Sequence, residues 1–211
     1  MPVLICHSST KPYGNIGPWR ATFRDEGSAT SYLPIGIVTG YTIRAGTGAD
    51  LPELGKIERD AAQLYRQAGY DFCADGPVRN DAEKLRALET GAVIVACTTA
   101  NKLCGFVLLW QVDNCAHILE LAVLRTHQGH GLGRRLMAQA EAWASSRGFK
   151  EITLTTYRDI AWNAPLYERL GYLGFEPDPW RTGLAEIQRE EADSGYAIKP
   201  RIAMRKPLKD A

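Results

Sequence analysis

The sequence predicts a mixed α/β (α+β) domain in which antiparallel strands come first and a parallel strand–helix–strand unit follows. Apolar and β-branched runs over residues 93–97, 103–111 and 116–124 are separated by short polar connections, as in successive antiparallel strands. Residues 132–147 then have apolar side chains at helical spacing, and residues 152–157 alternate like a strand. A helix between two strands predicts that those strands are parallel.

Composition limits the class of protein. The 211 residues suffice for one well-buried core, and 25 basic against 24 acidic side chains leave a net charge of +1, without the positive excess of a nucleic-acid-binding protein. No stretch reaches the roughly 20 apolar residues of a membrane span. Five cysteines without a C-x-x-C pair favour a reducing compartment, with Cys97 and Cys104 expected as small buried residues on strands. We expect a cytoplasmic protein that binds neither nucleic acid nor membrane.

The sequence divides into a part without secondary-structure signals and a part that carries all of them. Residues 1–38 show neither helical nor alternating periodicity, and we treat them as an N-terminal extension of unknown role. Residues 39–211 carry all the strand and helix signals and form the expected domain.

Helix signals flank the strands. Asp50 and Glu53 have the spacing of a capping box, so a helix is expected to begin at Asp50, and Gly69 is expected to end it. In the next helix Leu85 and Leu88 are expected to face the core. The remaining expected elements are a strand at residues 41–44, helices at 81–90, 164–170 and 186–193, and a last strand at 201–205.

A glycine-rich loop joins the strand over residues 116–124 to the helix that follows. Its sequence is Gln128-Gly129-His130-Gly131-Leu132-Gly133-Arg134. Glycines let the backbone turn tightly and approach another group without a Cβ in between. The first amides of a helix have no intrahelical acceptor and its dipole favours negative charge, so this segment is expected to bind an anion such as pyrophosphate. It lacks the Gly-Lys-Ser/Thr ending of a P-loop, and preceding antiparallel strands argue against a dinucleotide fold.

Two motifs together resemble a known family. Strand, Gln-x-x-Gly-x-Gly and helix are similar to the coenzyme-A loop of the GNAT N-acetyltransferase superfamily, with Gln128, Gly131 and Gly133 at the matching positions. Residues 163–172, Asn-Ala-Pro-Leu-Tyr-Glu-Arg-Leu-Gly-Tyr, resemble the family's later block with an asparagine, a tyrosine and Gly-Phe. The resemblance covers about residues 41–207. It implies a mixed sheet that splays open between its fourth and fifth strands, with acetyl-CoA in the opening.

The resemblance also implies roles for individual residues. Asn163 is expected to face the cofactor arm, although asparagine is also an ordinary helix cap. Tyr167 is expected to be the general acid that protonates the departing thiolate. Backbone of the fourth strand is expected to bind the pantetheine arm. The residues expected to bind acetyl-CoA are Leu121, Ala122, Val123, Gln128, Gly129, His130, Gly131, Leu132, Gly133, Arg134 and Asn163.

An acceptor amine has a typical pKa of about 10 and must lose a proton before it attacks a thioester. Glu120 is the candidate base, acting directly or through a water; the alternative is a solvated carboxylate at a strand end. His117 is a weaker candidate, because three residues of a regular strand would place it on the opposite face from Glu120. His127 and His130 resemble a metal-binding pair only superficially, and no metal is expected.

These expectations describe an acetyl-CoA-dependent acyltransferase. We expect the acceptor to be the amine of a small molecule and the protein to be a monomer or a homodimer. A protein N-terminus or lysine is the alternative acceptor. A non-catalytic acyl-CoA sensor is the alternative from another class.

Overall fold

The computed structural model describes residues 40–209, so the expected extension at residues 1–38 lies outside the described part. Within this described range, seven strands form one sheet in the order β1-β2-β3-β4-β5-β7-β6. The strands are β1 (Tyr41–Ala45), β2 (Ala92–Thr98), β3 (Leu103–Val112), β4 (Cys115–Val123), β5 (Glu151–Tyr157), β6 (Leu173–Phe175) and β7 (Arg201–Pro207). The helices are α1 (Leu51–Ala62), α2 (Asp71–Ala74), α3 (Asp81–Thr90), α4 (Leu132–Ser146), α5 (Ala164–Arg169) and α6 (Thr182–Asp193).

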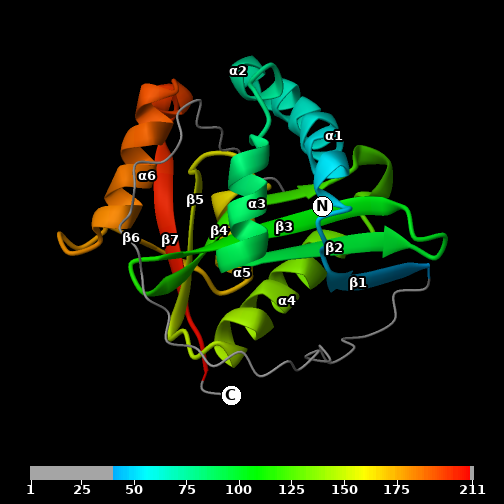
Figure 1. Cartoon of the computed structure of the whole chain (residues 1–211). Helices are drawn as coiled ribbons and strands as arrows, with labels where there is room; N and C mark the ends of the chain where they lie inside the picture. The colour runs from blue at the N-terminus through cyan, green and yellow to red at the C-terminus, as the bar shows by residue number, and fades with distance from the viewer. Residues whose placement is uncertain (1–39, 210–211) are drawn as a thin grey trace.

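The sheet opens between β4 and β5. These strands are parallel, as the sequence predicts, and they pair only from Ala116 opposite Ile152 to Ile118 opposite Leu154. Beyond Ile118 no further β4–β5 pair is found in residues 40–209. β5 instead pairs along its whole length with β7, and Figure 1 shows β5 and β7 running steeply across the direction of β2 and β3. The predicted mixed, splayed sheet is therefore confirmed.

Helices cover both faces of the sheet (Figure 1). On one face, here called the α4 face, α4 and α5 bury side chains such as Leu136, Trp143 and Tyr167. On the other, the α1 face, α1, α3 and α6 bury side chains such as Leu54 and Ile187. Cys97 and Cys104 are buried on strands, as expected. No helix in residues 40–209 is long and apolar enough to cross a membrane.

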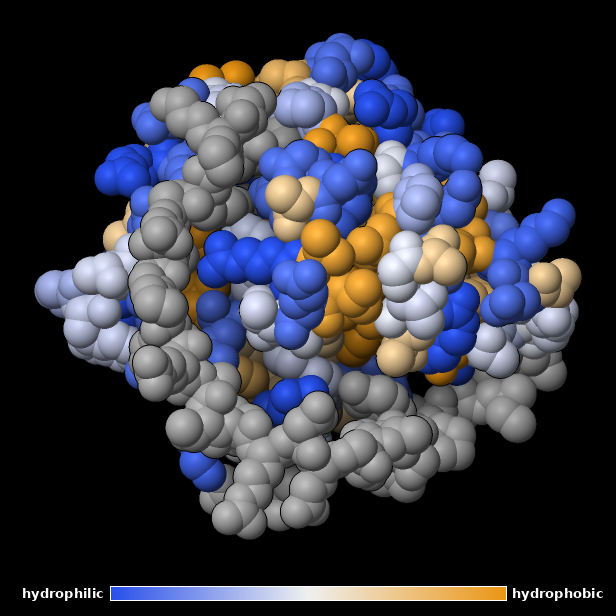
Figure 2. All heavy atoms as spheres, in the orientation of Figure 1, coloured by the Kyte–Doolittle hydropathy of each residue, from blue (hydrophilic) through white to orange (hydrophobic). Residues whose placement is uncertain are grey.

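The face of the molecule shown in Figure 2 is mostly hydrophilic. In Figure 2 polar residues surround an apolar patch near the centre of the visible face, in the region where Figure 1 places α3. Leu85 of α3 is 46% exposed, so the prediction that it faces the core is wrong, whereas Leu88 is half-buried and packs against the core of the α1 face. α3 buries Glu83, Lys84 and Ala87 instead, because Glu83 pairs with the fully buried guanidinium of Arg79.

α1 begins directly after Asp50, as predicted, but the Asp50 side chain does not cap the helix. Its carboxylate accepts hydrogen bonds from the Arg44 guanidinium (2.8 and 2.9 Å) and from the backbone N–H of Thr47 (2.8 Å). α1 has a proline in its first turn, where no amide hydrogen bond is needed. The capping box belongs to α3, where Asn80 accepts from the backbone of Glu83 and donates its own backbone N–H to the Glu83 carboxylate.

Several element boundaries depend on tertiary contacts. α1 ends at Ala62 and continues as a 3₁₀ helix to Gly69, whose φ of 73° ends the segment as predicted. α6 begins at Thr182, earlier than expected, because the carboxylate of Asp113 accepts the backbone N–H groups of Gly183 and Leu184 at 2.8 Å. This cap comes from the β3–β4 turn, far away in the sequence. The short elements α2 and β6 were without a sequence signal.

Candidate active site

The glycine-rich loop has open backbone in front of α4. Gly129 and Gly131 have φ values of 83° and 73°, in the left-handed region that favours glycine. A Cβ built on either residue meets nothing within 4 Å, so the space beside this backbone is open. The first backbone bond of the helix runs from Arg135 N to Gly131 O (3.1 Å), which leaves the amides of Leu132, Gly133 and Arg134 ahead of the intrahelical ladder. This geometry suits an anion.

The side chains of the loop have different tasks. Gln128 donates from Nε2 to the carbonyl of Val123 (3.0 Å), so it fixes the loop to the end of β4. His130 is exposed, and its Nδ1 lies 3.0 Å from the backbone carbonyl of Gln128. Arg134 is exposed in the first turn of α4. Nε and Nη1 of Arg135 are buried and have no hydrogen-bond partner in the described range, which adds a second cation close to the anion site.

The β4 strand contributes backbone to the opening. Leu121 and Val123 direct their side chains into the core of the α4 face, and Ala122 belongs to the core of the α1 face. Because β4–β5 pairing ends at Ile118, the β5-facing backbone of these three residues borders the splay. Their side chains are core residues, so only their backbone borders the opening.

Asn163 and Tyr167 come from the start and the middle of α5. The side-chain amide of Asn163 does not cap the helix; its Nδ2 donates to the hydroxyl of Tyr65 (3.0 Å). The Tyr167 side chain is fully buried, and its hydroxyl has no hydrogen-bond partner within residues 40–209. Burial and the charge of Glu120 raise the pKa of Tyr167 well above its usual value. The phenol is therefore protonated at neutral pH and can donate a proton.

Glu120 is fully buried, which excludes the alternative of a solvated strand-end carboxylate. Its carboxylate lies 3.7 Å from Nε of Arg79. The Arg79 guanidinium also donates to the Leu119 carbonyl (2.9 Å) and to the Glu83 carboxylate (3.0 Å). Arg79 thus joins the loop before α3 to the middle of β4 and places a positive charge beside the candidate base.

The expectation that His117 and Glu120 lie on opposite faces is wrong. The register between β3 and β4 shifts, so that Glu120 lies opposite Leu108 while Ile118 lies opposite Leu109. β4 therefore has one extra residue, a β-bulge at position 119. His117 lies opposite Trp110, and both Leu108 and Trp110 belong to the α1-face core. Directly opposed residues share a face, so His117 and Glu120 both point to the α1 face.

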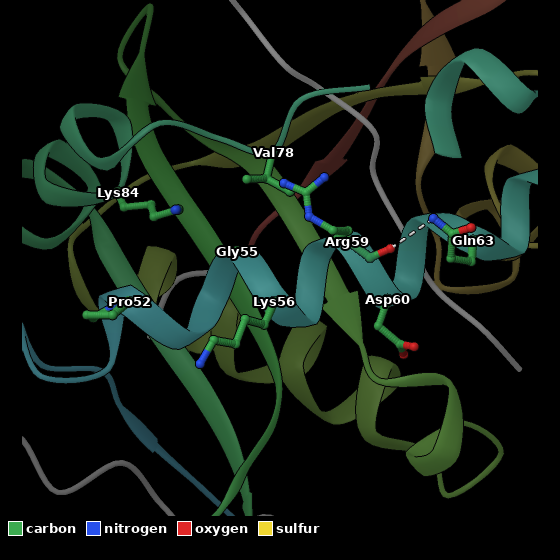
Figure 3. Close-up of a pocket in the computed structure, with 8 residues that line it drawn as sticks. All are labelled: Pro52, Gly55, Lys56, Arg59, Asp60, Gln63, Val78 and Lys84. Atoms are coloured by element: carbon green, nitrogen blue, oxygen red, sulfur yellow. Dashed lines mark hydrogen bonds between the residues drawn. The ribbon is translucent and has the colours of Figure 1, made fainter. Parts of the chain in front are cut away.

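A separate groove lies on the outside of α1. Its volume is about 610 Å³, and Figure 3 shows Lys84 reaching it from α3 while Arg59 rises from α1. Buried residues on the inner side of the same helix, including Leu54 and Ile57, separate the groove from β4. The groove is therefore distinct from the β4–β5 opening. Its lining residues are Pro52, Gly55, Lys56, Arg59, Asp60, Gln63, Val78 and Lys84.

Metal-binding geometry is not found in residues 40–209, where no group of three histidine, cysteine or carboxylate side chains could hold an ion. His127 and His130 do not form a pair of ligands. Nδ1 of His127 lies 2.9 Å from the hydroxyl of Tyr41, and Nδ1 of His130 faces backbone carbonyls.

A splayed mixed sheet, an anion-binding helix start after β4 and a buried tyrosine on α5 define the class of coenzyme-A-dependent acyltransferases. Residues 58–172 match the acetyltransferase (GNAT) family. The chain belongs to this family and is an acetyl-CoA-dependent acyltransferase.

Solved structures share the fold. A GNAT acetyltransferase from Staphylococcus aureus Mu50 has a TM-score of 0.58 at 14% identity, covering 80% of this chain and 99% of that chain. The ribosomal-protein-S18-alanine N-acetyltransferase from Escherichia coli has a TM-score of 0.56 at 21% identity, covering 81% and 96%. The PaiA N-acetyltransferase from Thermoplasma acidophilum, solved in complex with coenzyme A, has a TM-score of 0.56 at 17% identity, covering 81% and 100%.

Sequence reasoning missed two residues that shape this site. Tyr65 contacts Asn163 from the 3₁₀ helix after α1, and Arg79 contacts Glu120 from a loop. Tyr65 has the spacing of a core residue, and Arg79 stands in a loop without periodicity. Neither had a local signal for these contacts, which are made only in the folded chain.

Proposed function

We propose that the protein transfers the acetyl group of acetyl-CoA directly to the amine of a small molecule, with Glu120 as general base and Tyr167 as general acid. One observation carries this proposal. Beside the opening between β4 and β5 lie two fully buried groups, the Glu120 carboxylate on β4 and the Tyr167 hydroxyl on α5, and burial together with the charge of Glu120 raises the pKa of Tyr167. Two proton-transfer groups of opposite role therefore lie close together at the β4–β5 opening, where an acyl group can be placed between them.

The residues of the opening suit acetyl-CoA as the donor substrate. The backbone N–H groups from Gly129 to Arg134 suit a pyrophosphate, and the exposed Arg134 can add a charge-assisted contact. The β4–β5 pairing ends at Ile118, which supports the backbone of residues 121–123 as the proposed hydrogen-bond partner of the pantetheine arm. In this arrangement Asn163 closes the other side of the arm, and Tyr167 offers its proton to the sulfur.

The transfer requires two protons to leave the acceptor nitrogen. Glu120 takes the first from the ammonium group, which frees the lone pair that attacks the thioester carbonyl. As the C–N bond forms and the C–S bond breaks, Tyr167 gives its proton to the sulfur and regains one from the nitrogen. A thiol of pKa about 8.5 leaves more easily as a neutral group than as a thiolate. The proton on Glu120 then passes to solvent.

The burial of the proton-transfer groups favours a small acceptor. Glu120 and Tyr167 are both fully buried, and a small amine can enter such a site with less rearrangement than a folded protein. A protein N-terminus remains the second candidate, since the structurally similar enzyme from Escherichia coli is an alanine N-acetyltransferase of a ribosomal protein. A non-catalytic acyl-CoA sensor would need neither an acid nor a base at the thioester.

A thiol-release screen tests the proposal. Acetyl-CoA is incubated with the protein and with amines, polyamines, amino acids, antibiotics and peptides, and free coenzyme A is measured. Thiol release with a small amine supports the proposal, while release only with peptides, confirmed by their intact mass, supports the second candidate. Tight coenzyme-A binding in calorimetry without thiol release from any acceptor identifies a sensor.

A further inference from the structure

Nε2 of His117 is a buried polar atom that has no hydrogen-bond partner within residues 40–209. The other ring nitrogen, Nδ1, lies 2.9 Å from Oγ1 of Thr153 on β5. A buried polar atom without a hydrogen bond is costly and calls for an explanation. The hydroxyl of Tyr167 is a second buried atom without a partner, at the other side of the same opening. A bound substrate could supply the missing hydrogen bond to each of these two atoms.

His117 lies at the vertex of the opening. It is opposite Thr153 in the short parallel pairing, which ends one residue later at Ile118. Nδ1 is bonded to Cγ, the ring atom attached to Cβ, whereas Nε2 lies at the far end of the ring. Nε2 therefore points away from the sheet, into the α1 face. Glu120 points to the same face because of the bulge at position 119.

The proton of the ring follows from the partner of Thr153. When Oγ1 of Thr153 donates to the carbonyl of Ala116 (3.4 Å), Nδ1 of His117 donates to Oγ1 and Nε2 keeps a lone pair, and we assign this tautomer to the ring. Burial and the charge of Arg79 lower the pKa of His117 to about 3. The ring is therefore neutral, and Nε2 is a hydrogen-bond acceptor over the working range of pH.

We propose that Nε2 of His117 accepts a hydrogen bond from one N–H group of the acceptor amine, beside the Glu120 carboxylate. The site therefore selects primary amines. This inference rests on the proposed function. A primary ammonium group has three N–H bonds, and acetylation removes two of these protons. Glu120 receives one, and the other reaches the departing sulfur through Tyr167. His117 accepts a hydrogen bond from the third N–H group, the one that the amide product retains. A secondary amine keeps no N–H bond for this contact.

The test is the preference for a primary amine over its N-methyl derivative, expressed as a ratio of kcat/KM values. The probes are the amine with the fastest thiol release in the screen and that amine with one N-methyl group. His117→Gln and His117→Met form a matched pair, because both side chains are unbranched and similar in length, and only glutamine keeps a strong acceptor at its outer end. Wild type and His117→Gln should prefer the primary amine by about tenfold or more, which is the worth of one such hydrogen bond.

His117→Met should lose most of this preference and keep the affinity for coenzyme A, measured by calorimetry. If size alone decided the preference, His117→Met would keep it, and the inference would fail while acetyl transfer by the wild type still stood. A wild type without preference overturns the inference in the same way. A wild type that releases no thiol with any amine overturns the proposed function itself.

Thr153→Val provides a second test that keeps the imidazole and nearly the same shape. It removes the hydroxyl that accepts from Nδ1, so the ring loses its fixed orientation and the preference for the primary amine should fall severalfold. An unchanged preference in a folded Thr153→Val variant contradicts the assigned role of the His117–Thr153 pair.

Discussion

Nε of Arg79 lies 3.7 Å from the carboxylate of Glu120, and both side chains are fully buried. Removing a charge from water is costly unless an opposite charge is fixed nearby. Arg79 offsets this cost at the position where an ionised carboxylate is needed to accept a proton. Because Arg79 also binds the carbonyl of Leu119, the same residue holds the bulged part of β4 that turns Glu120 toward the α1 face.

Replacement of Arg79 tests this relationship. Arg79→Met should lower the free energy of unfolding by about 3–5 kcal/mol, because it removes the positive charge that both buried carboxylates, Glu83 and Glu120, face. Urea unfolding followed by circular dichroism measures the change. Arg66→Met is the control, since Arg66 forms ion pairs with Asp71 and Asp75 at the surface, and it should leave stability unchanged. Equal stability of Arg79→Met and wild type would mean that the buried charges do not depend on each other.

Tyr167→Phe should lower kcat by about a hundredfold or more, since general acid catalysis contributes roughly that much. Coenzyme-A affinity should change little, because the proposed role of the phenol is at the sulfur and not at the pyrophosphate. Tyr172→Phe is the matched control: the ring of Tyr172 lies 5.9 Å from that of Tyr167, but its hydroxyl donates to Glu141. Steady-state kinetics with an amine from the screen compares the two. Similar kcat values for both variants would remove Tyr167 from its catalytic role.

The loop is tested by Gly131→Asp. A carboxylate at this position repels the pyrophosphate and its Cβ enters the open space beside the amides, so calorimetry should show at least a hundredfold weaker coenzyme-A binding, from charge repulsion and lost amide contacts. Gly148→Asp is the control, because Gly148 has a similar φ of 79° and equally open space but follows the other end of α4. Both variants carry similar backbone strain. Retained affinity in Gly131→Asp would show that the loop does not bind the pyrophosphate.

The sequence predicts those parts of the protein whose signals are local. Gly131 and Tyr167 belong to motifs that can be recognised from neighbouring residues; Gly131 directly precedes α4 and Tyr167 lies on α5, where the sequence predicts helices. The face of Glu120 could not be predicted, because β4 is an almost unbroken apolar run and its bulge is visible only in the pairing with β3. The partner of Glu120 was equally hidden, since Arg79 reaches it from a loop forty-one positions earlier in the chain.

Asp50 gives the domain a stabilising contact that depends on pH. The hydrogen bond from Arg44 is the main cause that lowers the pKa of Asp50 from 3.8 to about 2. A carboxylate with a depressed pKa in the folded state adds stability above its unfolded pKa and loses it as the pH falls toward the folded pKa. The side chain of Arg44 is 35% exposed, so solvent screening reduces the contribution to about 1–2 kcal/mol.

Asp50→Asn should therefore be less stable than wild type by about 1–2 kcal/mol at pH 7, and the difference should shrink between pH 4 and pH 2, as Asp50 becomes protonated in both states of the wild type. Urea unfolding at several pH values measures both effects. Glu53→Gln is the control, because Glu53 pairs with Lys56 in an exposed contact, and it should have little effect at any pH. A difference between Asp50→Asn and wild type that stays constant down to pH 2 would show that the contact acts through shape and hydrogen bonding rather than through charge.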